Sequence, residues 1–417
     1  MRVLVISAAF PPMPSGEATN AYHLCQQLKA RGVDVHVLTS SDYRPPVEPG
    51  ITVHSVMQDW TWSEAPRLRR FLKACAPDVV YLMYLGWTYD FQFMSTFIPT
   101  IAKGVLPQTP VVTRFENIGG ARCESNSIAS RFIRKALATF TRQGQMDYQF
   151  GTLLRDSDSI VLLSSLHGPV LESLLPGVGR KCVLIPPPAN MCMSEADDAA
   201  GERGRQALGI QAGEALLAHI GFIYPGKGIE TLLRAFRRLA DEKGNVRLAI
   251  IGGSVAREFP DQPSYFENLQ AMARDLGLER RVIWTGEYRT DEELASTYLR
   301  AADICILPFD TGVKLNNSSF SSVAAHGRPI VTTTHAALEP QFVHRENVYL
   351  CPPQEPDQLA SAIAALVDDA HLRTRLGEGA LQLARDWYSW DSAMDKTFRL
   401  FGATGAPVSG AVSLSAG

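Results

Sequence analysis

The segment from residue 221 to residue 228 combines a lysine with three glycines, a composition that suits phosphate binding. A short apolar run ends at Gly221, Pro225-Gly226 turns the chain, and Lys227 stands just ahead of Gly228 and a stretch with apolar residues at helical spacing. A lysine at a helix entrance adds its charge to the helix dipole and to free backbone amides, which together suit a diphosphate. A solvated turn with an exposed lysine is the alternative.

A second polar segment follows the apolar run Ile304–Leu307. The string Lys314-Leu315-Asn316-Asn317-Ser318 leads into a helix expected over Ser319–His326. Asn and Ser side chains at a helix start can cap it or, with the first backbone amides, bind an anion. A capped helix without a ligand is the alternative. Histidines such as His326 and His335 are more often structural than catalytic.

A third loop, from Ala8 to Ala18, leads from the first expected strand into the first expected helix. Gly16 lies just ahead of that helix, so a phosphate could approach the backbone amides at the positive end of the helix dipole. The glycine triplet of a dinucleotide-binding fingerprint is missing. A plain turn between strand and helix is the alternative.

These loops belong to two successive rounds of alternating strands and helices. In the first half we expect strands over Val3–Ser7, Val33–Leu38, Val79–Leu82, Val111–Thr113, Ile160–Leu163 and Val183–Ile185, and helices over Ala18–Ala30, Arg67–Cys75 and about Ser127–Arg155. In the second half we expect strands over Leu216–Ile220, Arg247–Ile251, Val282–Trp284, Ile304–Leu307, Ile330–Thr333 and Val348–Leu350. Helices are expected between those strands and at the end, near Ile229–Asp241, Tyr265–Leu276, Asp291–Ala301, Ser319–His326, Pro356–Val367, His371–Trp387 and Ser392–Phe401. Such alternation predicts an α/β protein with parallel sheets, whose ligands bind at the carboxyl ends of the strands.

The boundary between the two rounds is expected at Pro186-Pro187-Pro188 and the polar stretch Ser194–Arg205, because prolines cannot join a strand ladder. The predicted domains are 1–188 and 206–386. A last helix over 387–402 and a flexible tail over 403–417 follow.

Composition excludes several classes of protein. A length of 417 residues suits two domains, and a net charge of −3 gives no reason to expect a nucleic-acid partner. The seven cysteines have no metal-ligand or redox spacing, which favours reduced thiols and a cytoplasmic location. The apolar start of the chain is too short for a secretory signal, and no apolar run is long enough to span a bilayer.

Taken in order, the segments resemble the retaining glycosyltransferases of family 4, also called glycosyl transferases group 1, which have the GT-B fold. The likeness covers nearly the whole chain. GFIYPGKGIETLLRAFRRL resembles the family's donor motif, and PPMPSGEATNAYHLCQQLKARGVDVHVLTS resembles its opening. RLAIIGG, RVIWTGEY, AADICILPF and HGRPIVTT follow in the family's order, and YSWDSAMDKTFRLF resembles its closing segment, whose last helix returns to the N-terminal domain.

The resemblance implies two Rossmann-like parallel-sheet domains that face each other across a cleft, with the first on the acceptor side. The second would hold a nucleotide sugar of UDP or GDP type, without a metal cofactor. Transfer would retain the anomeric configuration by front-face attack, and the leaving diphosphate would take the acceptor proton. The implied catalytic residues are Lys227, Glu116 and Lys314. The implied donor-binding residues are Gly16, Gly221, Phe222, Gly228, Gly252, Gly286, Leu315, Asn316, Asn317, Ser318 and Ser322.

Three departures from the family pattern concern this site. Lys314 and Ser322 stand where the family has paired glutamates, the first on the donor sugar and the second on the ribose. Phe222 replaces an arginine, which leaves Lys227 as the phosphate cation. The family's sugar-facing histidine is absent, and Glu116 is the nearest carboxylate. Glu116 could face the donor sugar or the acceptor, and Arg114 could hold an anionic group. Alternatively, both residues lie on a surface loop.

Other functions and partners stay open. A degenerate GT-B protein that binds nucleotide or glycan without turnover is the main alternative, and a sugar-nucleotide epimerase matches the Lys-Gly and Gly-x-Pro strings less well. The acceptor could be a small molecule, a glycan or a lipid-linked sugar, with aromatic residues at 60–62 and 85–93 as hints. The basic clusters at 67–70 and 131–135 leave weak peripheral membrane contact open, and a homodimer is also open.

Overall fold

The computed structural model describes residues 1–41, 49–118, 150–194, 198–254, 262–289 and 292–402. It divides into two compact units. The first comprises Met1–Met13, Glu17–Pro186 and the segment from Ala393 onward, and the second comprises Pro14–Gly16 and Pro187–Ser392. Most of the helix expected over 127–155, the basic cluster at 131–135 and the tail over 403–417 lie outside the described residues.

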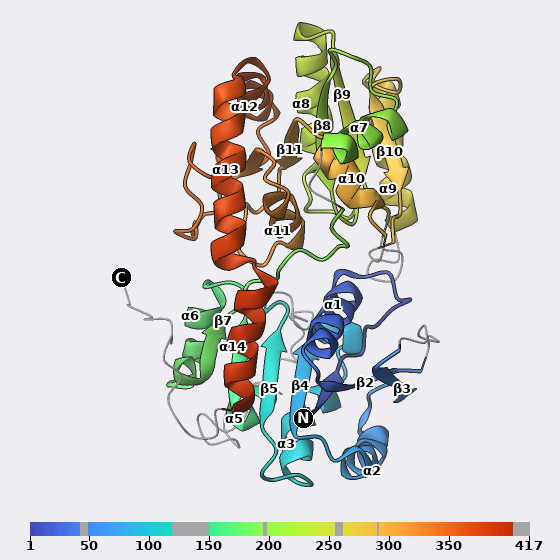
Figure 1. Ribbon diagram of the computed structural model, residues 1–417. Helices are drawn as coiled ribbons and strands as arrows, with labels where there is room; N and C mark the ends of the chain where they lie inside the picture. Colours follow the sequence, from blue (N-terminus) through green and yellow to red (C-terminus); the bar gives the residue numbers. More distant parts are fainter. Residues whose placement is uncertain (42–48, 119–149, 195–197, 255–261, 290–291, 403–417) are drawn as a thin grey trace, which may run out of the picture. The chain divides into compact units, whose positions relative to one another are not determined.

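The first unit is built on a seven-stranded sheet in the order β3-β2-β1-β4-β5-β6-β7 (Figure 1). All its strand pairs are parallel. The strands are β1 (Arg2–Ile6), β2 (Asp34–Ser40), β3 (Ile51–Met57), β4 (Val79–Tyr84), β5 (Val111–Phe115), β6 (Ser159–Leu162) and β7 (Cys182–Leu184). The central strands are near-continuous apolar runs because helices cover both faces of a parallel sheet.

Six α-helices contribute residues to the first unit within the described ranges: α1 (Gly16–Ala30), α2 (Ala65–Cys75), α3 (Ile98–Lys103), α5 (Leu153–Asp156), α6 (His167–Leu174) and α14 (Trp390–Gly402). The last of these packs on the sheet through an edge-to-face contact between Tyr81 on β4 and Phe401, whose ring centroids are 6.1 Å apart. The part of α14 from Ala393 onward thus belongs to the first unit.

The second unit has a six-stranded parallel sheet in the order β10-β9-β8-β11-β12-β13. The strands are β8 (Ala215–Ile220), β9 (Val246–Ile251), β10 (Val282–Gly286), β11 (Ile304–Leu307), β12 (Ile330–Thr333) and β13 (Tyr349–Cys351). The helices are α7 (Asp198–Ala207), α8 (Ile229–Glu242), α9 (Gln262–Asp275), α10 (Leu294–Ala301), α11 (Ser318–Ala325), α12 (Pro356–Asp368) and α13 (Ala370–Trp387). The strand order reverses direction between β8 and β11, which is where such sheets bind ligands at their carboxyl ends.

The α/β class with two parallel-sheet domains is confirmed. Strand β3 and helices α3, α6 and α7 were not predicted. β3 is an edge strand with several partly exposed residues, so its sequence lacks a long apolar run. Residues 198–207, expected to form a polar connection, belong to helix α7. A Cβ on Gly204 would lie 2.4 Å from the carbonyl oxygen of Thr297 in α10, so glycine allows this polar helix to pack closely.

No helix in the described part of the chain is both long and apolar enough to cross a membrane.

Candidate functional site

The loop after β8 bends back across the end of β11. Gly228 has φ +71°, and a Cβ on it would lie 1.8 Å from the carbonyl oxygen of Pro308. Only glycine permits both this φ angle and this approach. A hydrogen bond from the amide of Asp310 to the carbonyl oxygen of Gly226, 3.1 Å long, joins the two loops again. The predicted glycine-lysine segment therefore lies directly beside the second predicted loop.

Lys227 is buried, with 8% of its surface exposed, at this junction. Its Nζ is 3.6 Å from the position that a Cβ on Gly221 would take. It also lies over the rings of Tyr224 and Phe309, at 5.0 and 5.3 Å from their centroids. Contact with two aromatic faces stabilises a cation. The lysine is therefore a partly desolvated charge between the ends of β8 and β11, not a solvated turn residue.

Residues 314–317 form a turn tied down by two side chains. The amide of Lys314 donates to Oδ1 of Asn317 over 2.7 Å. The amide of Leu315 donates to Oε2 of Glu339 over 2.6 Å, and both Leu315 and Glu339 are buried. Asn317 is the N-cap residue of α11, and its side chain holds the turn before the helix. The sequence indicated the turn but not Glu339, which lies 24 residues away.

The start of α11 offers hydrogen-bonding groups to a ligand. Oγ of Ser319 and Oδ1 of Asn316 are buried and have no hydrogen-bond partner among the described residues. Ser319 Oγ and Lys227 Nζ lie 3.8 and 3.6 Å from the position that a Cβ on Gly221 would take. The first amides of a helix have no partner within the helix and carry its positive dipole end. Together with Lys227, these groups can bind a phosphate or diphosphate, and Ser319 is a residue that sequence reasoning missed.

The other predicted donor-binding residues of the second unit flank this junction. A Cβ on Gly252, at the end of β9, would lie 2.2 Å from the carbonyl oxygen of Gly221, so glycine is required there. A Cβ on Gly286, at the end of β10, would meet open space. Phe222 is partly buried in the loop after β8. Ser322 is buried in α11, one turn beyond Ser318, and its carbonyl oxygen accepts a hydrogen bond from His326. Their roles stay predictions.

In the first unit, Glu116 and Arg114 form a buried ion pair at the end of β5. Arg114 Nε lies 2.7 Å from Glu116 Oε1, and each side chain is about one-twentieth exposed. Burial raises the pKa of Glu116, and the charge of Arg114 opposes that rise. The pair is not on an exposed loop, and Arg114 already holds a carboxylate of this chain. A catalytic role for Glu116 stays a prediction, as does the role of Gly16 at the start of α1.

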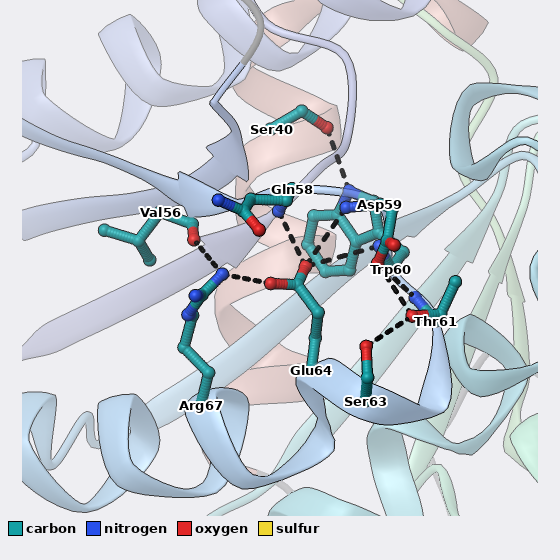
Figure 2. A network of polar contacts seen from close by, with 9 residues as sticks. All are labelled: Ser40, Val56, Gln58, Asp59, Trp60, Thr61, Ser63, Glu64 and Arg67. Atoms are coloured by element: carbon teal, nitrogen blue, oxygen red, sulfur yellow. Dashed lines mark hydrogen bonds and ion pairs between the residues drawn. The ribbon is translucent and has the colours of Figure 1, made fainter.

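A second buried carboxylate, Glu64, organises the loop after β3 (Figure 2). Its Oε2 accepts hydrogen bonds from the amides of Gln58, Asp59 and Trp60, at 2.6, 3.1 and 3.4 Å. Its Oε1 pairs with Arg67. Three amides in a turn otherwise form an anion-binding site, and here a side chain of the same unit fills it.

Trp60 extends this network to Ser40 at the end of β2 and to Tyr89 in the segment after β4. Its indole Nε1 donates to Ser40 Oγ over 2.8 Å, and its ring meets that of Tyr89 edge-on at 4.9 Å. It is 2% exposed, so it cannot contact an acceptor. Among the aromatic residues suggested as acceptor contacts, Trp62 and Phe91 are exposed, by 51% and 45%.

Within the described residues, no group of three or more His, Cys, Asp or Glu side chains is placed to hold a metal ion. The absence of a metal cofactor stays an expectation.

Comparison with known families identifies both halves of the chain. The profile described as "Glycosyl transferases group 1" matches residues 214–369. The profile described as "Glycosyl transferase 4-like domain" matches residues 15–164. One match lies within each predicted domain, in the order that the sequence motifs indicated.

Several curated relatives share one name. A D-inositol 3-phosphate glycosyltransferase from Corynebacterium jeikeium is 28% identical, over an alignment that covers 96% of each chain. Proteins of the same name from Corynebacterium glutamicum and Corynebacterium efficiens are 33% and 31% identical, but these matches span only 45% and 53% of each relative's length.

Solved structures share the fold. Sucrose-phosphate synthase from Thermosynechococcus elongatus superposes with a TM-score of 0.72 at 18% identity, covering 97% of this chain and 100% of that one. Anabaena Alr3699/HepE, solved in complex with UDP and glucose, gives 0.69 at 15% identity over the same shares of the two chains. The fold, the two family profiles and the order of the motifs agree, and the chain belongs to the group 1 glycosyltransferases, family 4, with the GT-B fold.

Proposed function

We propose that the protein transfers a sugar from a nucleoside diphosphate sugar to an acceptor hydroxyl, with retention of the anomeric configuration. The observation that carries this proposal is the junction in the second unit. Lys227, the Ser319 hydroxyl and the start of α11 meet where the sheet order reverses. A buried cation, an unpartnered hydroxyl and a helix N-terminus match the needs of a diphosphate.

The donor is proposed to be a UDP or GDP sugar. Structural neighbours with the same fold have been solved with UDP and glucose or with UDP-glucose, which makes UDP sugars the first candidates. In the proposal, Gly221, Phe222, Gly228, Gly252 and Gly286 line the nucleotide at the strand ends. Asn316 and Ser318 present their amides, while Leu315 and Asn317, whose amides donate to Glu339 and to the carbonyl oxygen of Lys314, hold the turn in shape. Lys314 and Ser322 are placed on the donor sugar and the ribose, and Gly16 beside the diphosphate.

The proposed mechanism is front-face displacement. The bond between the anomeric carbon and the diphosphate oxygen breaks, and the acceptor oxygen forms a bond on the same face. The leaving diphosphate takes the acceptor proton. Negative charge therefore grows on the diphosphate in the transition state, and the pre-placed Lys227 charge and α11 amides lower the barrier by stabilising it. A metal ion is not part of this proposal.

The acceptor is proposed to be a polyhydroxylated small molecule. The relative that aligns over nearly its full length is named for D-inositol 3-phosphate, so this compound heads the acceptor panel. The exposed rings of Trp62 and Phe91 are the aromatic groups offered for contact with the acceptor. We also propose that the reaction takes place in the cytoplasm, where nucleotide sugars are available.

The test is a transfer assay with EDTA present. UDP-glucose, UDP-N-acetylglucosamine and GDP-mannose are each supplied with D-inositol 3-phosphate and a set of monosaccharides, and the product is identified by proton NMR. The proposal expects release of the nucleoside diphosphate together with a product that keeps the anomeric configuration of the donor. An inverted product would contradict the retaining mechanism.

A binder without turnover is the second candidate, and one observation favours it. Glu116, the candidate carboxylate in the first unit, is engaged by Arg114, while Lys314 and Ser322 replace the family glutamates. This candidate expects nucleotide-sugar binding with neither transfer nor donor hydrolysis for any acceptor.

A further inference from the structure

His219 lies where β8 and β11 separate. The ladder between these strands ends at the pair Ala218–Cys305, and His219 is the next residue on β8. It is completely buried, and its Nδ1 lies 2.9 Å from the carbonyl oxygen of Ile306. Because a carbonyl oxygen only accepts, Nδ1 carries the hydrogen and donates it. The imidazole therefore bridges the two strands just beyond the end of their ladder.

The second ring nitrogen of His219 is an acceptor without a partner. With the hydrogen on Nδ1, the neutral ring has a bare lone pair on Nε2. Nε2 is buried, and no described protein atom forms a hydrogen bond with it. An unsatisfied buried acceptor lowers stability, so such a group calls for a functional explanation.

Lys227 is the charged residue that acts on this imidazole. Burial, and then the positive charge of Lys227, lower the pKa of His219 to about 4. The ring is therefore neutral at physiological pH and stays an acceptor at Nε2. The lysine ammonium also lies 3.6 Å from the Cβ position of Gly221, two residues after His219. The ammonium of Lys227, a hydrogen-bond donor, and Nε2 of His219, a hydrogen-bond acceptor, thus both lie at the carboxyl end of β8.

We propose that His219 is a positioning residue for Lys227, accepting a hydrogen bond at Nε2 from the lysine ammonium, directly or across one water molecule, when a diphosphate occupies the site. This inference rests on the proposed function. A carboxylate in the same place would direct the ammonium equally well but would neutralise its charge. A neutral imidazole directs the ammonium and leaves its full charge for the diphosphate.

Two substitutions separate the tasks of the two ring nitrogens. His219→Asn keeps an amide N–H at the position of Nδ1, able to donate to Ile306, and removes the acceptor at Nε2. His219→Phe removes both groups. The matched control is His326→Gln, another buried histidine of the second unit. Both nitrogens of His326 have partners, the carbonyl oxygen of Ser322 and the hydroxyl of Ser296.

The probe is inorganic pyrophosphate, titrated calorimetrically into the full-length chain. It contains the diphosphate group that all the candidate donors share, without their base or sugar. We expect His219→Asn to weaken binding about tenfold and His326→Gln to change it less than about twofold. In a Lys227→Met background, His219→Asn should have no further effect, because a positioning residue has nothing left to position. Wild-type affinity in His219→Asn, or an additive loss in the double variant, would overturn the inference.

A second measurement leaves His219 in place, so it does not depend on how the variants fold. NMR titration of the histidine ring should give a higher pKa for His219 in Lys227→Met than in the wild type, and an unchanged pKa would overturn the contact. If Lys227→Met binds pyrophosphate as the wild type does, the proposed diphosphate site fails, whatever His219 does. If Lys227→Met weakens pyrophosphate binding but the His219 variants bind as the wild type does, the diphosphate site is supported and the inference about His219 fails.

Discussion

The carbonyl oxygen of Pro308 occupies the space that a side chain on Gly228 would need, with only 1.8 Å between that oxygen and a Cβ on Gly228. Through this contact, the loop that carries Lys227 packs against the end of β11. The contact explains how two segments about 80 residues apart form one site. The close approach is possible because Gly228 has no side chain and tolerates φ +71°.

Gly228→Ala should therefore disrupt the junction. The clash is with backbone, which cannot rotate away, so we expect a loss of about 2–4 kcal/mol in the free energy of unfolding, measured by urea titration. Gly244→Ala is the matched control, because a Cβ there would meet nothing within 4 Å and its φ angle is not left-handed. Equal stability of the two variants would show that Gly228 and Pro308 do not approach each other this closely.

Lys227→Ala should lower kcat/KM by an amount equivalent to about 2–4 kcal/mol of transition-state stabilisation. The lysine belongs to a loop, so the fold should survive, which circular dichroism would check. Lys243→Ala is the control: Lys243 pairs with Asp368 at the end of α8 and should not affect turnover. Wild-type turnover in Lys227→Ala would rule out its proposed role.

Lys314→Ala should reduce kcat/KM with the best donor, because residue 314 is proposed to face the donor sugar. Lys314→Glu should not give a better enzyme, because a glutamate beside the phosphates would have no compensating arginine at position 222. The same kinetic assay decides both. A gain in activity for Lys314→Glu would mean that the pocket is a family site that has lost activity. That result would support the second candidate function, binding without turnover.

Acid should destabilise the fold through His219 and His326. Burial is the main reason that the pKa of each is lowered to about 4, from an ordinary value near 6.5. At pH 5 the unfolded chain therefore binds nearly two protons more than the folded chain. From these two groups, stability should be fully present above about pH 6.5 and fall by roughly 2–3 kcal/mol per pH unit toward pH 4. Urea unfolding at several pH values measures this slope, and His326→Gln should halve it; an unchanged slope would contradict the assignment.

Glu64→Leu should destabilise the first unit by about 3 kcal/mol, since three backbone amides lose their acceptor at once. Arg67→Met is the companion variant. The Arg67 side chain is 41% exposed, so losing this partner should cost under about 1 kcal/mol. Urea unfolding of both variants makes the comparison, and a smaller effect of Glu64→Leu would show that the amides are solvated instead.

The sequence was informative where local pattern and chain direction decide the structure. The apolar run before Gly221, the turn at Pro225-Gly226 and the helical spacing after it predicted that Lys227 stands just ahead of a helix, and α8 begins at Ile229. The asparagine and serine string predicted a helix from Ser319, and α11 begins at Ser318. Parallel sheets bring carboxyl ends of strands together, so these two loops could be expected to meet.

The features that the sequence did not predict depend on contacts between residues far apart in the chain. Glu339 supports the turn at Leu315, and Glu64 gathers amides from a loop whose sequence has no ligand pattern. His219 looks like one more residue of a buried strand until β11 is placed beside it. Helix α7 was missed because its sequence is polar and two glycines lower its helix propensity, and packing on α10 offsets this.

The measurement that tests the central claim most directly is a thermal-shift screen of UDP, GDP, ADP and TDP sugars on the wild type and on Lys227→Ala. A ligand that binds only the folded state raises the melting temperature by mass action. We predict that one nucleotide series, with UDP or GDP as its base, raises the melting temperature of the wild type, and that this rise is lost in Lys227→Ala. The account is contradicted if no nucleotide sugar shifts the wild type, or if the shift is equally large without the Lys227 ammonium.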